Sequence, residues 1–330
     1  MGSMTRPAAL VAVLALVAAA CTNSTGGATG SPPADTPAAT PAATPEASAS
    51  PSPAAEQYVA NAAEFVAAAD WDSAIEVTIE LSEFAFAPKD LTLVAGQPYV
   101  LKVSNVGTVK HEFTAGEFFR TVATRKAETA ESEVKVPYFT EIEVFAGKAV
   151  EIYLIPLVPG TYELVCEIEG HLEAGMLGSI SVTGEAPASP AIELGEVAAG
   201  PWVQDGADRV SAADWDSAQH LTIELSEFAF TPDDIPLEAG QPYVITVMNV
   251  GAVKHEFTAG DFFGSVAFRK AEDASGEFKA PAPHEIEVFA GQEIEMYMIP
   301  TTAGRYQLVC EIEGHLEAGM SGAIDVAPGT

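Results

Sequence analysis

The sequence contains one eleven-residue segment twice, CEIEGHLEAGM, from Cys166 to Met176 and again from Cys310 to Met320. The first copy places a thiol, an imidazole and a thioether at Cys166, His171 and Met176. Two glycines in each segment permit tight turns, so the three donors of a copy can face a single point. We therefore expect each copy to form a metal-binding loop.

A fourth donor has to come from elsewhere in the chain. TYELVC is typical of a strand that ends at Cys166, and another strand is expected to end at His111. Besides the loop histidines, only His111 and its counterpart His255 occur in both copies. Two imidazoles, a thiolate and a weak axial thioether are the ligand set of a blue copper electron-transfer site. The sequence thus predicts two sites, with the ligands His111, Cys166, His171 and Met176 in the first and His255, Cys310, His315 and Met320 in the second.

The donors recur because the chain contains an internal duplication. ADWDSA begins at Ala69 and again at Ala213, and the other repeated segments have the same step, since 213 − 69 = 144. The first copy aligns with the second from Asp70 to Met176 without insertion or deletion. A constant step over such a length indicates a duplicated folded domain and not a short solenoid repeat.

Short segments within each copy alternate apolar and polar residues, among them VTIEL, PYVLKVSNVG, TEIEVFAG and VEIYLIPL. Turn signals such as AGQP and VPG separate them. This pattern predicts an all-β protein with two tandem Greek-key β-sandwich domains. One segment departs from it: residues Glu117–Glu128 have helical spacing, and we expect a helix or an irregular flap there.

With these motifs, each copy resembles a domain of the cupredoxin superfamily, which includes plastocyanin, azurin, auracyanin and rusticyanin. The Cys-x4-His-x4-Met loop is similar to the auracyanin and rusticyanin form, and the KHEF and EFF segments resemble exported bacterial cupredoxins. The resemblance implies two type 1 (blue) coppers per chain, one in each domain, and electron transfer as the function. Copper handling or resistance is the alternative, since it would use the same ligands.

One position departs from this resemblance. Many cupredoxins have Asn directly after the first histidine, where it ties two loops together, whereas this chain has Glu112 and Glu256. An ionised carboxylate cannot donate the same hydrogen bond. We therefore expect the surroundings of the thiolate, and with them the reduction potential, to differ from the usual arrangement.

The N-terminus resembles an export signal. Residues 1–21 contain Arg6, an apolar run and three alanines before Cys21, so we expect a signal peptide with a possible lipobox and lipidation of Cys21. Cleavage near Ala20 without lipidation is the alternative. We therefore expect the protein to be exported to the periplasm or the cell surface and to be attached to the membrane by a lipid anchor.

Composition divides the rest of the chain. Residues 22–69 are rich in Ala, Pro and Thr and are expected to form a disordered tether followed by a short helix. We place domain 1 at residues 70–184, a linker at 185–213 and domain 2 at 214–330. Cys166 and Cys310 are interpreted as one thiolate ligand in each domain, with a disulfide between them as the alternative.

The chain is strongly acidic, with 15 Lys+Arg against 47 Asp+Glu and a formal net charge of −32. This charge excludes nucleic-acid binding and favours cations and basic partners. Glu167, Glu169 and Glu173 lie close to the loop histidine in the sequence. We therefore expect a redox partner protein with a basic docking patch.

The number of histidines bears on catalysis. The cupredoxin-related nitrite reductases and multicopper oxidases need further copper held by additional histidines. This chain has 6 His, and the two outside the predicted sites, His220 and His284, are isolated and unrepeated. We expect these two to be surface residues, and on this count we expect the chain not to be an enzyme.

Overall fold

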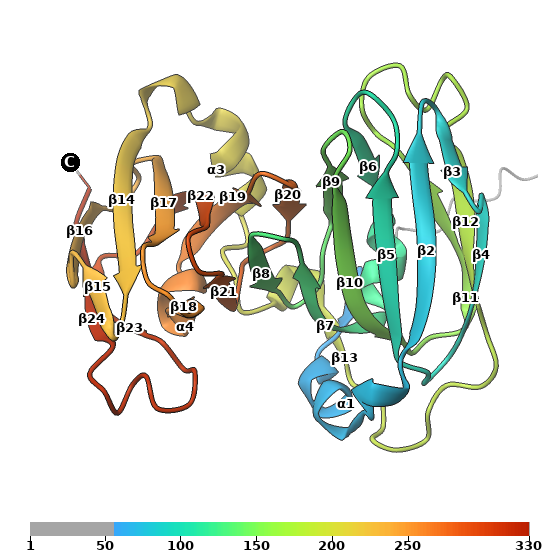
Figure 1. Ribbon diagram of the computed structural model, residues 1–330, viewed down its shortest axis with the longest axis horizontal. Helices are drawn as coiled ribbons and strands as arrows, with labels where there is room; N and C mark the ends of the chain where they lie inside the picture. The colour runs from blue at the N-terminus through green and yellow to red at the C-terminus, as the bar shows by residue number, and fades with distance from the viewer. Residues whose placement is uncertain (1–55, 330) are drawn as a thin grey trace, which may run out of the picture. The chain divides into compact units, whose positions relative to one another are not determined.

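The computed structural model describes residues 56–329 (Figure 1). The predicted signal peptide, the lipidation site Cys21 and residues 22–55 of the predicted tether lie outside the described residues. Within the described range short strands dominate and the helices have at most seven residues. The predicted all-β fold is confirmed.

Each repeat is a sandwich of two β-layers (Figure 1). In the first repeat one layer has the order β3-β2-β5-β10-β7, and the other contains β4-β12-β11 together with β6-β9. Most neighbours are antiparallel, but β2 runs parallel to β5 and β4 runs parallel to β12. The strands of the first repeat are β2 (Ile75–Ser82), β3 (Ala85–Ala87), β4 (Asp90–Val94), β5 (Tyr99–Asn105), β6 (His111–Phe113), β7 (Val122–Glu128), β8 (Ser132–Lys135), β9 (Glu141–Val144), β10 (Ala149–Pro156), β11 (Gly160–Val165) and β12 (Leu177–Thr183).

The second repeat has the same architecture. Its layers have the orders β15-β14-β17-β22-β19 and β16-β24-β23-β18-β21. The strands are β14 (Gln219–Ser226), β15 (Ala229–Thr231), β16 (Asp234–Glu238), β17 (Tyr243–Asn249), β18 (His255–Thr258), β19 (Val266–Glu272), β20 (Gly276–Lys279), β21 (Glu285–Val288), β22 (Glu293–Pro300), β23 (Gly304–Val309) and β24 (Ser321–Ala327).

The core between the layers is built by the inward-facing residue of every second strand position. In β4, for example, Leu91 and Leu93 are buried while their neighbours are exposed. Phe113 and Phe119 are fully buried, with ring centroids 6.0 Å apart. Burying a side chain of this size contributes about 1.5–3 kcal/mol. These rings lie beside the end of β6, so the core fixes the strand that begins with His111.

The segment Glu117–Glu128 is not one helix. Helix α2 (Gly116–Arg120) covers only its beginning, and from Val122 the chain continues as β7. This strand pairs along its length with β10, and its first three residues are buried. Helical spacing in a short apolar run does not distinguish the two structures, and here pairing with the sheet decides the outcome.

The predicted linker contains regular structure. Strand β13 (Leu194–Glu196) pairs with β1 (Gln57–Val59), and helix α3 (Gly206–Ala212) stands 144 residues after α1 (Ala62–Ala68), since 206 − 62 = 144. The end of the linker therefore repeats the segment that precedes the first sandwich. The domain borders at 70–184 and 214–330 stay predictions.

The two repeats exchange strands. Strand β8 pairs with β7 of its own repeat at two positions and with β21 of the other repeat at four. In the same way β20 pairs with β19 of its own repeat and with β9 of the first (Figure 1). Each exchanged strand thus joins one layer of its own repeat to the layer of the other repeat that contains β6 or β18.

A buried polar cluster lies where the exchanged hairpins meet. The carboxylate of Asp273 accepts hydrogen bonds from the hydroxyls of Thr129 and Ser132, both at 2.6 Å, and from the backbone N–H of Ser275 at 2.8 Å. The Ser275 hydroxyl in turn donates to Glu131. Burial raises the pKa of Asp273, and these donors oppose that rise. The cluster ties the two repeats together through groups that have little access to water.

Between residues 56 and 329, none of the helices combines the length and the apolar character that crossing a bilayer requires.

Replacing Asp273 by Ala tests this cluster. Because the change leaves several buried donors without an acceptor, we expect the free energy of unfolding to fall by about 2–4 kcal/mol. Urea denaturation of the metal-free protein measures the change. Asp216→Ala removes an exposed carboxylate and should alter stability by less than about 0.5 kcal/mol. Equal effects of the two substitutions would contradict a structural role for the cluster.

Candidate metal centres

A short contact between two strands brings the distant donors together. Thr114, directly after β6, forms a β-bridge with Val165 at the end of β11, with backbone hydrogen bonds of 3.0 Å in both directions. His111 at the start of β6 therefore lies close to Cys166, which follows β11. The same arrangement occurs in the second repeat, where Thr258 pairs with Val309.

The donor atoms form two compact clusters. The ligand atoms of His111, Cys166 and His171 lie within 4.8 Å of one another, and so do those of their counterparts His255, Cys310 and His315. In the first cluster Cys166 Sγ lies 3.3 Å from His171 Nδ1. The structure brings together the residues that the sequence analysis grouped, and their assignment as ligands stays a prediction.

The loop between Cys166 and Met176 is closed by its own backbone. The N–H of Cys166 donates to the carbonyl of Met176 at 3.2 Å, and the N–H of Met176 donates to the carbonyl of His171 at 3.0 Å. Gly170 and Gly175 have φ values of +84° and +103°, which side chains with a Cβ rarely adopt. The loop thus places the backbone of Met176 next to that of Cys166, and the Met176 side chain is fully buried.

The first cluster has the properties of a cation site. Among the described residues, neither ring nitrogen of the buried His111 has a hydrogen-bond partner. Burial lowers the pKa of His111, and the charge of His171 lowers it further, so the ring is a neutral donor. Burial raises the pKa of the Cys166 thiol. A cation would satisfy one of the two orphaned ring nitrogens and displace the thiol proton.

The structure leaves both thiols unpaired. Cys166 and Cys310 are free and buried, so the disulfide considered as an alternative is not present. The two remaining histidines, His220 and His284, are exposed and belong to neither cluster.

Glu112 forms a tie that the sequence analysis did not expect. Its side-chain Oε2 accepts a hydrogen bond from the N–H of Glu167 at 2.8 Å, and its own N–H donates to Cys166 Sγ at 3.3 Å. Glu256 makes the same contacts in the second repeat. Burial raises the pKa of Glu112, and the nearby Glu141 carboxyl raises it further. We expected the tie between the two segments to be lost without the Asn amide. Instead, the Glu112 carboxyl holds them together as a hydrogen-bond acceptor.

Sequence reasoning missed one aromatic residue at each cluster. The Phe84 ring contacts His171 edge-on, with ring centroids 5.1 Å apart, and Phe228 contacts His315 in the same way. Both phenylalanines have a φ of 65°, an unusual value for a bulky residue, and both remain partly exposed. Their identical recurrence within LSEFAF was the available signal.

The surface next to the loop histidine is both acidic and apolar. Glu167, Glu169 and Glu173 are exposed, whereas Glu112, which the sequence also placed at the metal-bearing end, is buried. Leu172 in the same loop and Val109 before β6 are also exposed apolar side chains.

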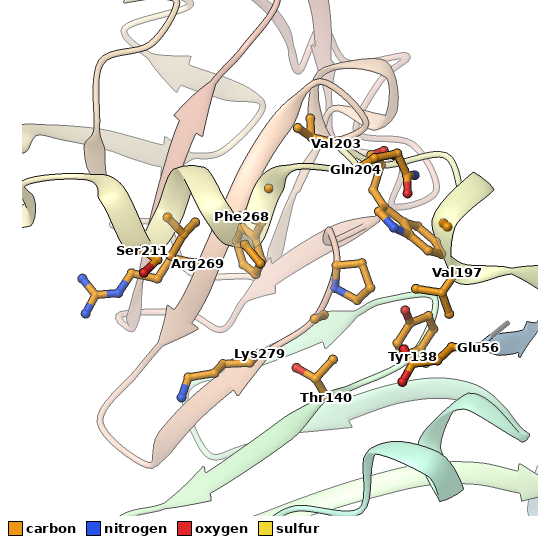
Figure 2. A pocket seen from close by; sticks show the side chains of 17 residues that line it. Glu56, Tyr138, Thr140, Val197, Val203, Gln204, Ser211, Phe268, Arg269 and Lys279 are labelled. Atoms are coloured by element: carbon orange, nitrogen blue, oxygen red, sulfur yellow. The ribbon is translucent and has the colours of Figure 1, made fainter. Parts of the chain in front are cut away.

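A cavity of about 700 Å³ lies away from both clusters (Figure 2). Its walls include the aromatic residues Tyr138, Trp202 and Phe268, with Lys279 on the strand below. None of the eight predicted ligands lines it. This cavity therefore does not mark the metal centres.

Comparison with known proteins gives matches in sequence. Residues 57–177 match the family described as cupredoxin-like domain. The copper-resistant cuproprotein CopI of Rubrivivax gelatinosus is 31% identical over 97 residues, which cover 29% of this chain and 59% of that protein. The protein of the same name from Pseudomonas aeruginosa is 23% identical over 141 residues, covering 34% and 78%. The chain thus spans about three fifths of the first of these relatives.

Solved structures also match. Auracyanin from Roseiflexus castenholzii is 18% identical with a TM-score of 0.26, covering 34% of this chain and 99% of that protein. The Cu-containing nitrite reductase of Thermus scotoductus is 15% identical with a TM-score of 0.28, covering 76% and 61%. Likeness at this level concerns the fold alone.

The prediction that the chain is not an enzyme is corrected by these matches. Solved structures that match across both repeats are named as a nitrite reductase and multicopper oxidases, which are enzymes. The histidine count alone was therefore not sufficient ground for excluding catalysis. With TM-scores of 0.28 to 0.30, the matches assign no reaction to this chain.

Replacing Phe84 by Ala tests whether this ring shields the loop histidine. In the metal-free variant we expect diethyl pyrocarbonate to modify His171 severalfold faster, because the edge of the imidazole loses its cover. Peptide mass spectrometry follows the modification, and His315, with Phe228 intact, is the internal control. An unchanged ratio of the two rates would show that Phe84 does not shield the histidine.

Proposed function

We propose that this chain, of which residues 57–177 match a cupredoxin-like domain, is an exported copper-binding protein that acts in copper handling or resistance. In this proposal it binds two type 1 coppers, one in each repeat.

One observation carries the proposal. In each repeat an imidazole from a strand and a thiol and an imidazole from a distant loop converge to within 4.8 Å, with a buried methionine at the end of the same loop. This is the donor set that favours copper, because soft sulfur and imidazole together suit that metal. The recurrence of the whole set 144 residues later supports two equivalent centres.

The residues have distinct parts in such a centre. His111 and His171 supply neutral imidazole nitrogens, Cys166 loses its proton to become a thiolate, and Met176 provides the weak fourth donor. Copper, when bound, supplies a one-electron redox couple. The Glu112 N–H stabilises the thiolate by donating to its sulfur. Burial of the donors keeps water out of the centre.

The relatives favour handling or resistance over electron transfer. Both curated proteins that match this chain are named as copper-resistant cuproproteins. Export to the periplasm or the cell surface is part of the proposal and rests on the signal-like N-terminal sequence. Anchoring through a lipid on Cys21 remains part of the proposal, as the sequence motif alone supports it.

Electron transfer is the second candidate function. The observation in its favour is that the donors converge and are buried, so a change of copper oxidation state would need little rearrangement. The exposed glutamates beside His171 would then attract a redox partner with a basic docking patch.

Titration with Cu(II) tests the proposed centres. We expect an intense thiolate-to-copper absorption band that saturates at two coppers per chain, because each repeat supplies one thiolate. Cys166→Ser should remove half of the band and Cys166→Ser with Cys310→Ser all of it. A colourless protein that binds stoichiometric zinc at these residues would contradict the proposal.

Copper tolerance tests the proposed role in the cell. A copper-sensitive bacterium that exports this chain should grow at higher copper concentrations, and His255→Ala should weaken the protection because the second centre loses a ligand. His220→Ala, an exposed histidine of the same repeat, is the matched control and should protect like the unchanged chain. If the chain gives no protection but exchanges electrons rapidly with cytochromes, the second candidate function replaces the first.

A further inference from the structure

Each ligand-bearing layer is completed by a strand from the other repeat. Strand β9 lies between β6, which begins with His111, and β20 of the second repeat. In the second repeat β21 lies between β18, which begins with His255, and β8 of the first. The strand next to each predicted histidine ligand is therefore held on its other side by the opposite repeat.

A chain of contacts leads from the second repeat to the first centre. Lys279 Nζ lies 2.6 Å from Glu141 Oε1, and the Glu141 carboxyl lies close to that of Glu112 on the paired strands β9 and β6. Glu112 Oε2 then accepts from the N–H of Glu167, the residue after Cys166, at 2.8 Å. A lysine of one repeat thus reaches the backbone next to the thiol of the other through two carboxyl groups.

The reciprocal chain exists at the second centre. Lys135 of the first repeat pairs with Glu285, and the Glu285 carboxyl lies close to that of Glu256 on the paired strands β21 and β18. Glu256 Oε2 accepts from the N–H of Glu311, the residue after Cys310, at 3.0 Å. Lys135 Nζ also lies 4.0 Å from Glu256 Oε1. The two lysines are counterparts in the duplication, since 279 − 135 = 144.

The local charges do not replace these lysines. Lys110, the nearest lysine in sequence to the first centre, is paired with Glu143 at 2.8 Å. Lys279 is the cation in direct contact with Glu141, and its charge also acts on Glu112. Two adjacent carboxyl groups with little access to water repel each other unless a cation or a shared proton holds them in place.

We propose that Lys279 and Lys135 are positioning residues that act across the repeats, each ordering the carboxyl pair beside the metal centre of the other repeat. The two centres are thereby reciprocally dependent, and neither repeat holds its own thiolate surroundings in full without the other. The proposal rests on the proposed copper function for its spectroscopic consequence, but the contacts themselves exist without metal. Lys279 also lies on the wall of the large cavity, so its charge is reachable from the surface (Figure 2).

Single-centre proteins separate the two effects. Cys310→Ser retains only the first centre and Cys166→Ser only the second, and Lys279→Met and Lys135→Met are each placed in both backgrounds. Cu(II) is the probe, and the energy of the thiolate-to-copper band and the reduction potential are the readouts. Lys279→Met should shift both readouts of the first centre and leave the second unchanged. Lys135→Met should do the reverse.

A metal-free measurement accompanies these readouts. Amide hydrogen exchange by NMR should show the Glu167 N–H exchanging about tenfold faster in Lys279→Met, the change expected when a charge-supported hydrogen bond weakens. The Glu311 N–H should be unaffected. Lys279→Arg keeps the charge and should restore slow exchange, and Lys279→Gln replaces the Met variant where that variant does not fold. Lys102→Met, which removes an ion pair with Glu151 elsewhere in the first repeat, is the control.

The results separate this inference from the proposed function. If Lys279→Met leaves the first centre and the Glu167 amide unchanged, or alters both centres equally, the cross-repeat dependence is refuted. If neither single-centre protein develops a thiolate band with Cu(II), the copper function fails, and the amide exchange in the metal-free chain still decides the inference.

Discussion

The contact between the end of β6 and the end of β11 is the constraint on which both metal centres depend. The bridge between Thr114 and Val165 sets His111 beside Cys166, two residues that are far apart in the sequence. The Glu112 N–H then points at the cysteine sulfur. Because this contact is made by backbone groups, the fold itself holds the two donor-bearing segments side by side.

The two sandwiches that the duplication produced are not independent of each other. Exchange of β8 and β20 inserts a strand of each repeat beside the ligand-bearing layer of the other. The buried carboxylate of Asp273 holds the exchanged hairpins through donors of both repeats. The same exchange brings one lysine to each carboxyl pair. Structural support for the centres is therefore shared between the repeats, which explains why charged residues occupy positions of low exposure in the exchanged strands.

The sequence permitted prediction of the all-β fold and the grouping of donors, because donor types and their spacing recur without a gap in both copies. The strand exchange could not be foreseen. The alternation of β8 fits either neighbour, and nothing in a period of two tells which strand it joins. The segment Glu117–Glu128, which contains β7, was expected to be a helix or an irregular flap, because a short apolar run does not distinguish a helix from a strand. The tie made by Glu112 was missed because its side chain was considered only as a hydrogen-bond donor. The contact of Phe84 with His171 was missed because the segment LSEFAF contains none of the residue types that bind copper.

The central claim is that distant donors meet around one copper in each repeat. Anomalous diffraction at the copper edge from crystals of the copper-loaded protein tests it most directly. The account predicts two peaks per chain, one among His111, Cys166 and His171 and one among His255, Cys310 and His315. Copper peaks elsewhere on the chain, or a loaded crystal in which neither sulfur lies within bonding distance of copper, would contradict it.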